Sequence, residues 1–150
     1  MKSLLMKSLR LLAVGMLVVV AACAWRPNPE KRAREFFDEG RDMIMSTLKK
    51  QDASEAQLQA AKAVMRSNKP TLPPEIADVL RKQQALLRAI VTGQDSATLA
   101  KLEADLHQTN EKAVQAIGRM HEELATAVGD KTWKATTADL DQRWARHFSE

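Results

Sequence analysis

The sequence predicts an all-α fold of four to five antiparallel helices that includes a long helical hairpin. Residues that favour helices, above all Ala, Leu, Lys, Glu, Gln and Arg, dominate the 150-residue chain, whereas glycine and proline contribute five each. From position 30 onward, apolar residues recur three and four positions apart, and no segment predicts a strand. Residues that typically start and stop helices separate these stretches, so the chain divides into several helices with short connections.

The first two helices are expected on either side of the break QDAS, residues 51–54. The first begins after Pro29 and runs to about Lys50. Its inward stripe is predicted to hold Ala33, Phe36, Phe37, Gly40, Ile44, Thr47 and Leu48. The second follows Ser54, which has Gln57 three residues later in the pattern of a capping box, and ends near Ser67. Its inner positions are Leu58, Ala61, Val64 and Met65.

The segment SNKPTLPP, residues 67–74, is the clearest helix breaker after position 30. A helix over 75–91 should follow, because the proline pair ends any preceding helix and suits the first turn of the next. Its stripe is Ile76, Val79, Leu80, Leu87 and Ile90, which Gln83 interrupts. Gly93 suits a position just past this helix, and Asp95 suits the N-cap of the next one.

The longest predicted helix covers 96–128 and carries a heptad-like apolar seam. The seam consists of Leu99, Leu102, Leu106, Thr109, Ala113, Ile117, Met120, Leu124 and Val128. Gly129 and Asp130 should end this helix and cap a last one over 131–148. That helix places Trp133, Thr137, Leu140, Trp144 and Phe148 on one side.

The aromatic side chains and the width of the apolar stripes bear on how the helices pack. Helical spacing predicts that five aromatic residues belong to the core, namely Phe36, Phe37, Trp133, Trp144 and Phe148. A surface that binds other proteins is the alternative for these side chains. The stripes are narrow, which favours an extended or hairpin-like homodimer over a compact monomer.

Residues 1–22 have the three-part composition of a secretory signal. Lys2, Lys7 and Arg10 lie in a short basic region, and residues 11–22 are twelve apolar or small residues without a charge. A membrane-spanning helix needs about 20 apolar residues, so this stretch is too short to be one. The formal net charge of +4 falls to +1 once these three cations are removed, since the first acid is Glu30.

The only cysteine of the chain, Cys23, ends this segment in the sequence VAAC, residues 20–23. This sequence resembles the lipobox of bacterial lipoproteins. The resemblance implies that a diacylglyceryl group is attached to the Cys23 thiol, that a peptidase cuts between Ala22 and Cys23, and that the new amine is then acylated. Several acyl chains would anchor the protein stably in a membrane. A signal peptide with an incidental cysteine, or a short buried helix, is the alternative.

Three domains follow from this interpretation: a signal peptide over 1–22, a lipidated cysteine with its tether over 23–29, and a helical periplasmic domain over 30–150. The tether contains two prolines and is expected to be extended. Ala24 stands where aspartate would favour the inner membrane, so by resemblance the expected location is the periplasmic face of the outer membrane.

The order of helices and breaks in the body resembles the Spy/CpxP family of periplasmic proteins, which includes heavy-metal sensors. The family's LTxxQ motif would correspond to ASEAQ, residues 53–57, where Ser54 keeps the capping chemistry. Its second copy would be ADLDQ, residues 138–142, with Asp139 as the cap, or its place would be taken by VGDKT, residues 128–132. The resemblance spans about residues 43–148. It implies a dimeric helical cradle that binds unfolded envelope proteins without ATP, or a stress sensor beside a membrane regulator.

The remaining patterns argue against other functions. The body lacks the basic stripe expected of a nucleic-acid-binding protein, and the chain contains no glycine-rich nucleotide loop and no HExxH motif. We therefore expect neither an enzyme nor a cofactor.

The metal-binding members of the resembled family make histidines worth considering. His107 and Glu111 are four residues apart and could share an ion, and Met120, His121 and His147 are further candidates. His107 and His121 lie fourteen residues apart on one helix, about 21 Å, so they cannot share one ion within a chain. Surface or interface histidines are the expected alternative. A structural lipoprotein whose long helix pairs with an envelope partner is a third possible function.

Overall fold

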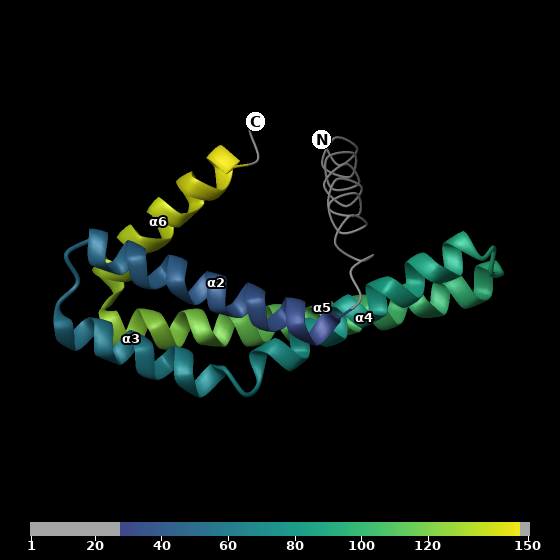
Figure 1. Cartoon of the computed structure of the whole chain (residues 1–150), viewed down its shortest axis with the longest axis horizontal. Coiled ribbons are helices and arrows are strands. Elements are labelled where there is room, and N and C mark those ends of the chain that lie inside the picture. Colours follow the sequence, from purple (N-terminus) through teal and green to yellow (C-terminus); the bar gives the residue numbers. More distant parts are fainter. Residues whose placement is uncertain (1–27, 148–150) are drawn as a thin grey trace, which may run out of the picture.

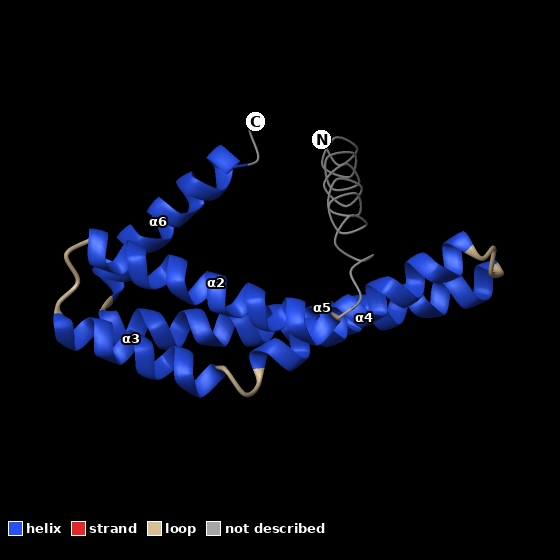
Figure 2. Cartoon of the chain, in the orientation of Figure 1, coloured by secondary structure: helices blue, strands red, loops and turns tan. Residues whose placement is uncertain are grey.

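The structure is a computed structural model that describes residues 28–147, with side chains up to Arg143. Within this range the chain is all-α, and its five helices pack in antiparallel fashion, as the sequence predicts (Figure 2). They are α2 (Pro29–Lys50), α3 (Glu55–Asn68), α4 (Leu72–Val91), α5 (Ser96–Val128) and α6 (Asp130–His147). The signal peptide, Cys23, residues 24–27 of its tether and Phe148 lie outside the described residues, as do the side chains of Trp144 and His147. The end of the expected tether is not extended but helical, because Pro29 is the first residue of α2.

The long helix α5 contacts three of the other helices, α3, α4 and α6. Helices α3 and α4 follow one another in the same direction, and α5 returns antiparallel along both of them (Figure 1). Helix α2 packs on α3 and α4, and α6 leaves the end of α5 to contact α2. The outer parts of α4 and α5 project beyond the other helices as a two-helix hairpin.

Local signals position most of the helix ends. The Asn28 side chain accepts a hydrogen bond from the Lys31 amide at 2.9 Å, directly before Pro29 at the first helical position. The capping box at Ser54 and Gln57 is present, with both reciprocal hydrogen bonds formed. Asp95 accepts from the Thr98 amide at 2.9 Å and caps α5 as predicted.

The prediction that the proline pair lies in the first turn of α4 is confirmed, whereas the predicted cap of the last helix is wrong. Helix α4 begins at Leu72, three residues before Glu75, and Pro73 and Pro74 lie inside its first turn. Proline is tolerated there because the first amides of a helix have no partner within the helix. Asp130 is not the N-cap of the last helix but its first residue, since Gly129 precedes it and accepts from the Trp133 amide at 3.0 Å.

The core lies where α2, α3, the start of α4, α5 and α6 meet, away from the projecting hairpin. Its buried members are Phe37, Ile44, Leu48, Leu58, Ala61, Met65, Leu72, Ala116, Met120, Leu124, Val128 and Trp133. Between residues 80 and 112, by contrast, Ala89 is the one buried residue. The hairpin therefore buries its apolar seam only in part, because two helices alone leave each other's flanks exposed to solvent.

Helix α6 is attached by its first half. Trp133 is 7% exposed and Thr136 is fully buried. The Thr136 hydroxyl donates to the carbonyl of Thr132 at 2.8 Å, so this buried group is satisfied. Further along, Asp139 lies 2.7 Å from Lys50 of α2 and 2.9 Å from Arg143. The hydrogen bond from Lys50 lowers the pKa of the Asp139 carboxyl, and Arg143 adds to this effect.

Candidate functional site

The first candidate site, Cys23, precedes the described residues by a short stretch of chain. The described chain begins at Asn28, the cap of α2, so only residues 24–27 separate this cap from Cys23. Within residues 28–147, every helix is too short or too polar to span a bilayer.

The second candidate region is the pair of motifs on which the family resemblance depends. The Gln57 side chain is shared by three partners: its oxygen accepts from the Ser54 amide at 2.8 Å, and its nitrogen donates to the carbonyl of Val128 and, at 3.3 Å, to the hydroxyl of Thr132. Gln57 thus connects the start of α3 to the junction between α5 and α6. Sequence reasoning identified Gln57 as a capping residue but did not predict this long-range contact.

The structure distinguishes the two readings of the second motif by their place in the fold. ADLDQ, residues 138–142, lies inside α6, so the prediction that Asp139 caps a helix is wrong. VGDKT, residues 128–132, lies at the α5–α6 junction and supplies the two partners of Gln57 there. Residues 128–132, and not residues 138–142, therefore bring the start of α6 against the start of α3.

Four of the five metal candidates lie on α5, and the fifth, His147, is the last residue of α6. The imidazole of His107 lies 3.3 Å from the Glu111 carboxylate, and both side chains are exposed. Met120 is buried in the core. The ring of His121 contacts Trp133 edge-on at 5.3 Å between centroids, and partial burial lowers the pKa of its imidazole below the ordinary value of 6.5. Among the side chains that the structure describes, residues 28–143, no group of three or more His, Cys, Asp or Glu is suited to a metal ion.

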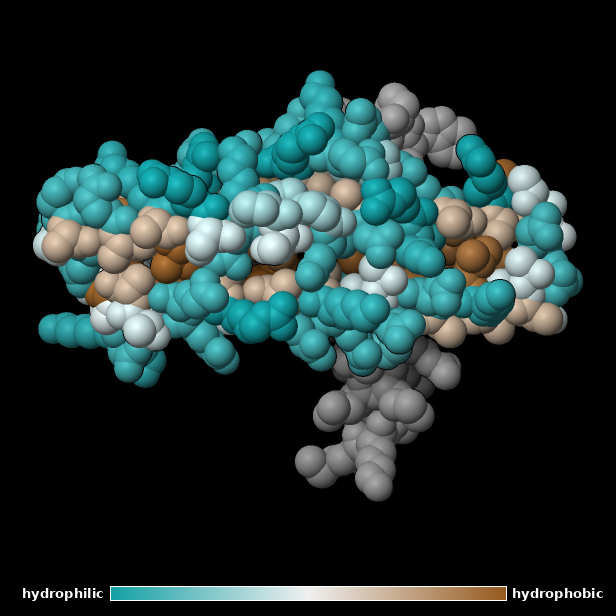
Figure 3. Space-filling view, turned by 90° about the horizontal axis from the view of Figure 1, so that it is seen from below, coloured by the Kyte–Doolittle hydropathy of each residue, from teal (hydrophilic) through white to brown (hydrophobic). Residues whose placement is uncertain are grey.

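Four large apolar side chains are exposed on this otherwise charged surface. Phe36 is 54% exposed, Val114 57%, Ile90 50% and Val91 73%. The prediction that Phe36 and Ile90 face the core is therefore wrong. Phe36 and Phe37 are adjacent and point about 100° apart on the helix, so only Phe37 reaches the core. Figure 3 shows apolar residues between hydrophilic ones, including toward the end of the hairpin.

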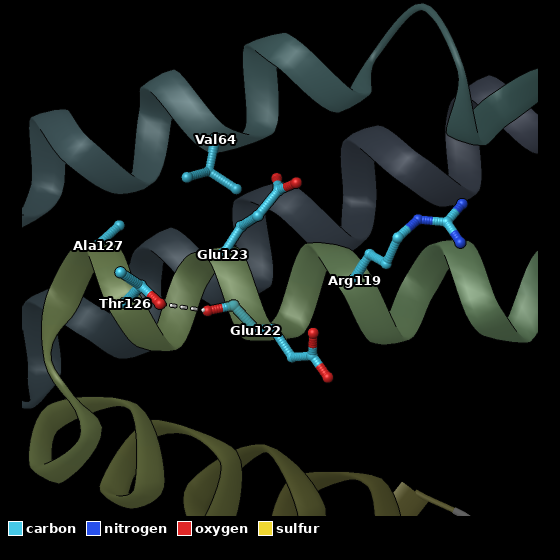
Figure 4. A pocket seen from close by; sticks show the side chains of 6 residues that line it. All are labelled: Val64, Arg119, Glu122, Glu123, Thr126 and Ala127. Atoms are coloured by element: carbon cyan, nitrogen blue, oxygen red, sulfur yellow. Dashed lines mark hydrogen bonds between the residues drawn. The ribbon is translucent and has the colours of Figure 1, made fainter.

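A shallow hollow of about 570 Å³ lies between α3 and α5 (Figure 4). Val64 lines it from α3, and Arg119, Glu122, Glu123, Thr126 and Ala127 line it from α5. The Glu123 carboxylate points toward α3 and accepts from the Asn68 amide at 2.8 Å. With one apolar wall and a mixed charged wall, the hollow has the chemistry of a solvated groove rather than of an enclosed ligand site.

Comparison of the chain with models of protein families, with curated proteins and with solved structures gives no match.

Gln57 offers a direct test of the junction. Because it satisfies one helix-capping amide and two groups at the α5–α6 junction, Gln57→Ala should lower the free energy of unfolding by about 1–3 kcal/mol. Urea denaturation followed by circular dichroism measures this change. Gln57→Glu should destabilise the protein less than Gln57→Ala, because glutamate keeps the oxygen that caps α3. It should still destabilise the junction, because a carboxylate cannot donate a hydrogen bond to the carbonyl of Val128.

Gln59→Ala is the matched control, because Gln59 bonds only to Glu55 on the surface of the same helix, at 2.6 Å. It should change stability by less than about 0.5 kcal/mol. Equal losses for Gln57→Ala and Gln59→Ala would show that the junction contributes nothing.

Proposed function

We propose that this protein is a lipoprotein of the bacterial envelope whose helical domain holds unfolded proteins without nucleotide hydrolysis. The observation that carries the holding function is the exposure of Phe36 and Val114, at 54% and 57%, on helices that are otherwise charged. The VAAC sequence at residues 20–23 supports the anchor, and Ala24 supports the periplasmic face of the outer membrane as its location. The protein is proposed to act by binding alone and not as an enzyme.

The physical mechanism is weak, repeated apolar contact. Unfolded chains expose aliphatic and aromatic side chains, and each buried CH₂ group contributes about 0.8 kcal/mol. A few isolated apolar side chains among charges therefore bind such chains too weakly to prevent their release and folding. A homodimeric cradle, in which two copies present these side chains together, would multiply the contacts without making any one of them strong.

The experiment is suppression of aggregation of a denatured client, measured by light scattering with no metal or ATP added. We expect the wild-type protein to suppress aggregation at near-stoichiometric concentration. Replacing both Phe36 and Val114 by serine should raise the required concentration several-fold, because the exposed apolar area is removed.

The control exchanges two exposed alanines, Ala63 and Ala135, for serine, which removes little apolar area. Circular dichroism establishes that both double variants remain folded. Absence of suppression by the wild-type protein, or equal activity of the two double variants, would contradict the holding function.

Metal sensing is a second candidate, which the 3.3 Å approach of His107 to Glu111 favours. Because two ligands hold an ion weakly, this function would require a third ligand from another copy or from a partner. A saturable zinc, copper or nickel titration that His107→Ala abolishes would support metal sensing over client binding. Co-purification of one stoichiometric envelope protein would instead support a structural lipoprotein.

A further inference from the structure

The end of the α4–α5 hairpin carries an apolar pair that the proposed holding function does not use. Ile90 and Val91 close α4 and are 50% and 73% exposed. They lie beside the polar connection of residues 92–95, which leads into α5. We call residues 90–95 the hairpin tip. Ala89 is the one buried residue between positions 80 and 112, so no other part of the described chain covers the tip.

The tether length limits where a membrane can lie relative to the tip. Five residue steps separate Cys23 from Asn28, and an extended chain spans at most about 18 Å over that distance. The adjoining start of α2 is attached to α4, because Arg81 forms an ion pair with Glu30. Val91 lies ten residues beyond Arg81 on α4, about 15 Å along the helix axis. A membrane that holds Cys23 is therefore within reach of the base of the hairpin and of its tip.

From this geometry we propose that the hairpin tip inserts Ile90 and Val91 into the surface of the membrane to which Cys23 is anchored. The inference rests on the lipid anchor of the proposed function. Two aliphatic side chains are too little to hold a free protein on a bilayer, but the tether makes their binding intramolecular, at an effective concentration on the order of millimolar.

Membrane contact by the tip would orient the protein. Arg88 and Asp95 flank the apolar pair with opposite charges, so the contact should depend little on anionic lipid. With the anchor and the tip both at the bilayer, the hairpin lies against the lipid surface. The rest of the body, including the core-bearing half with α3 and α6, would then be held at a set orientation to the periplasm.

The test places an environment-sensitive fluorophore at the tip of the full lipidated protein. Gln94→Cys is exposed and provides the reactive thiol, because acylation occupies the Cys23 sulfur. In vesicles of phosphatidylethanolamine and phosphatidylglycerol at a 3:1 ratio, we expect a blue-shifted emission. Lipids that carry a doxyl quencher should reduce this emission at least twofold. Replacing Ile90 and Val91 by aspartate should abolish both effects.

The matched control carries the fluorophore at Ala63→Cys, an exposed position on α3 in the other half of the molecule, and should show no quenching. A blue shift that rises with protein concentration and is insensitive to the quencher would mean that a second copy covers the tip. That result, or an unshifted spectrum, overturns the proposal.

The anchor is tested separately, by flotation of the unlabelled protein with vesicles. If Cys23 is not acylated, the tip is still tested by replacing Cys23 with a hexahistidine segment and binding it to nickel-chelating lipid in the same vesicles. Quenching of the protein held by nickel-chelating lipid supports tip insertion even if Cys23 is not acylated. Flotation without quenching supports the anchor and refutes the tip.

Discussion

Replacing Cys23 with serine is expected to move nearly all of the protein from the membrane fraction to the soluble periplasmic fraction. Serine has almost the same size but lacks the thiol to which a diacylglyceryl group would be attached, so all acyl chains of the anchor are lost together. One acyl chain binds membranes only reversibly, and stable anchoring takes at least two, so no intermediate degree of binding is expected once the thiol is absent. Cell fractionation and labelling with radioactive palmitate measure the two consequences.

The control is Ala24→Ser, a small exchange next to the same thiol, which should leave both the palmitate label and the membrane fraction unchanged. If the Cys23→Ser protein remains bound to membranes and the wild-type chain takes up no palmitate, the lipoprotein interpretation is wrong. The client assay with the Phe36 and Val114 variants does not depend on this outcome, because it uses the helical domain in solution.

Leu124→Ala is expected to cause the largest loss of stability in the helical domain. Leu124 is fully buried on α5, in the core that α2, α3 and α6 share with it. Removing its side chain loses transfer free energy and leaves a cavity that these helices cannot close without moving. Comparable substitutions cost about 2–5 kcal/mol, which is a large part of the total stability of a domain of this size. Urea denaturation of both proteins gives the difference.

Leu102→Ala is the matched control, since it makes the same change on the same helix in the projecting hairpin. Leu102 is only partly buried there, so its loss should be clearly smaller. A loss at Leu102 as large as that at Leu124, and present only at high protein concentration, would indicate that a second copy buries the hairpin seam in solution.

Helix positions could be predicted because their signals are local. Ser54 with Gln57, Asp95, and the proline segment before α4 act on amides within three or four residues, so their effect does not depend on the rest of the fold. The errors were also local in origin. The stretch predicted for α4 starts three residues too late, at Glu75, and Asp130 is the first residue of α6 rather than its cap.

Burial could not be predicted with the same success, because it depends on which helices lie opposite. Phe36 and Ile90 have helical spacing to their neighbours, as core residues do, yet both are half exposed. Phe37 occupies the inward-facing position on α2, so the adjacent Phe36 faces solvent. Ile90 lies in the outer part of the α4–α5 hairpin, against which no third described helix packs. The same limitation applied to Asp139, whose partner Lys50 is 89 positions away.

From the sequence by itself came an all-helical chain, the breaks between its helices, most of the caps that begin them and the proposal of a lipid anchor at Cys23. Periodicity and capping depend on residues close together in the chain, so they can be identified from the sequence alone. Only the tertiary structure decided that Gln57 joins α3 to the α5–α6 junction and that the apolar pair Ile90 and Val91 is left uncovered at the hairpin tip. Such outcomes depend on contacts between residues distant in sequence, which arise only when the helices pack.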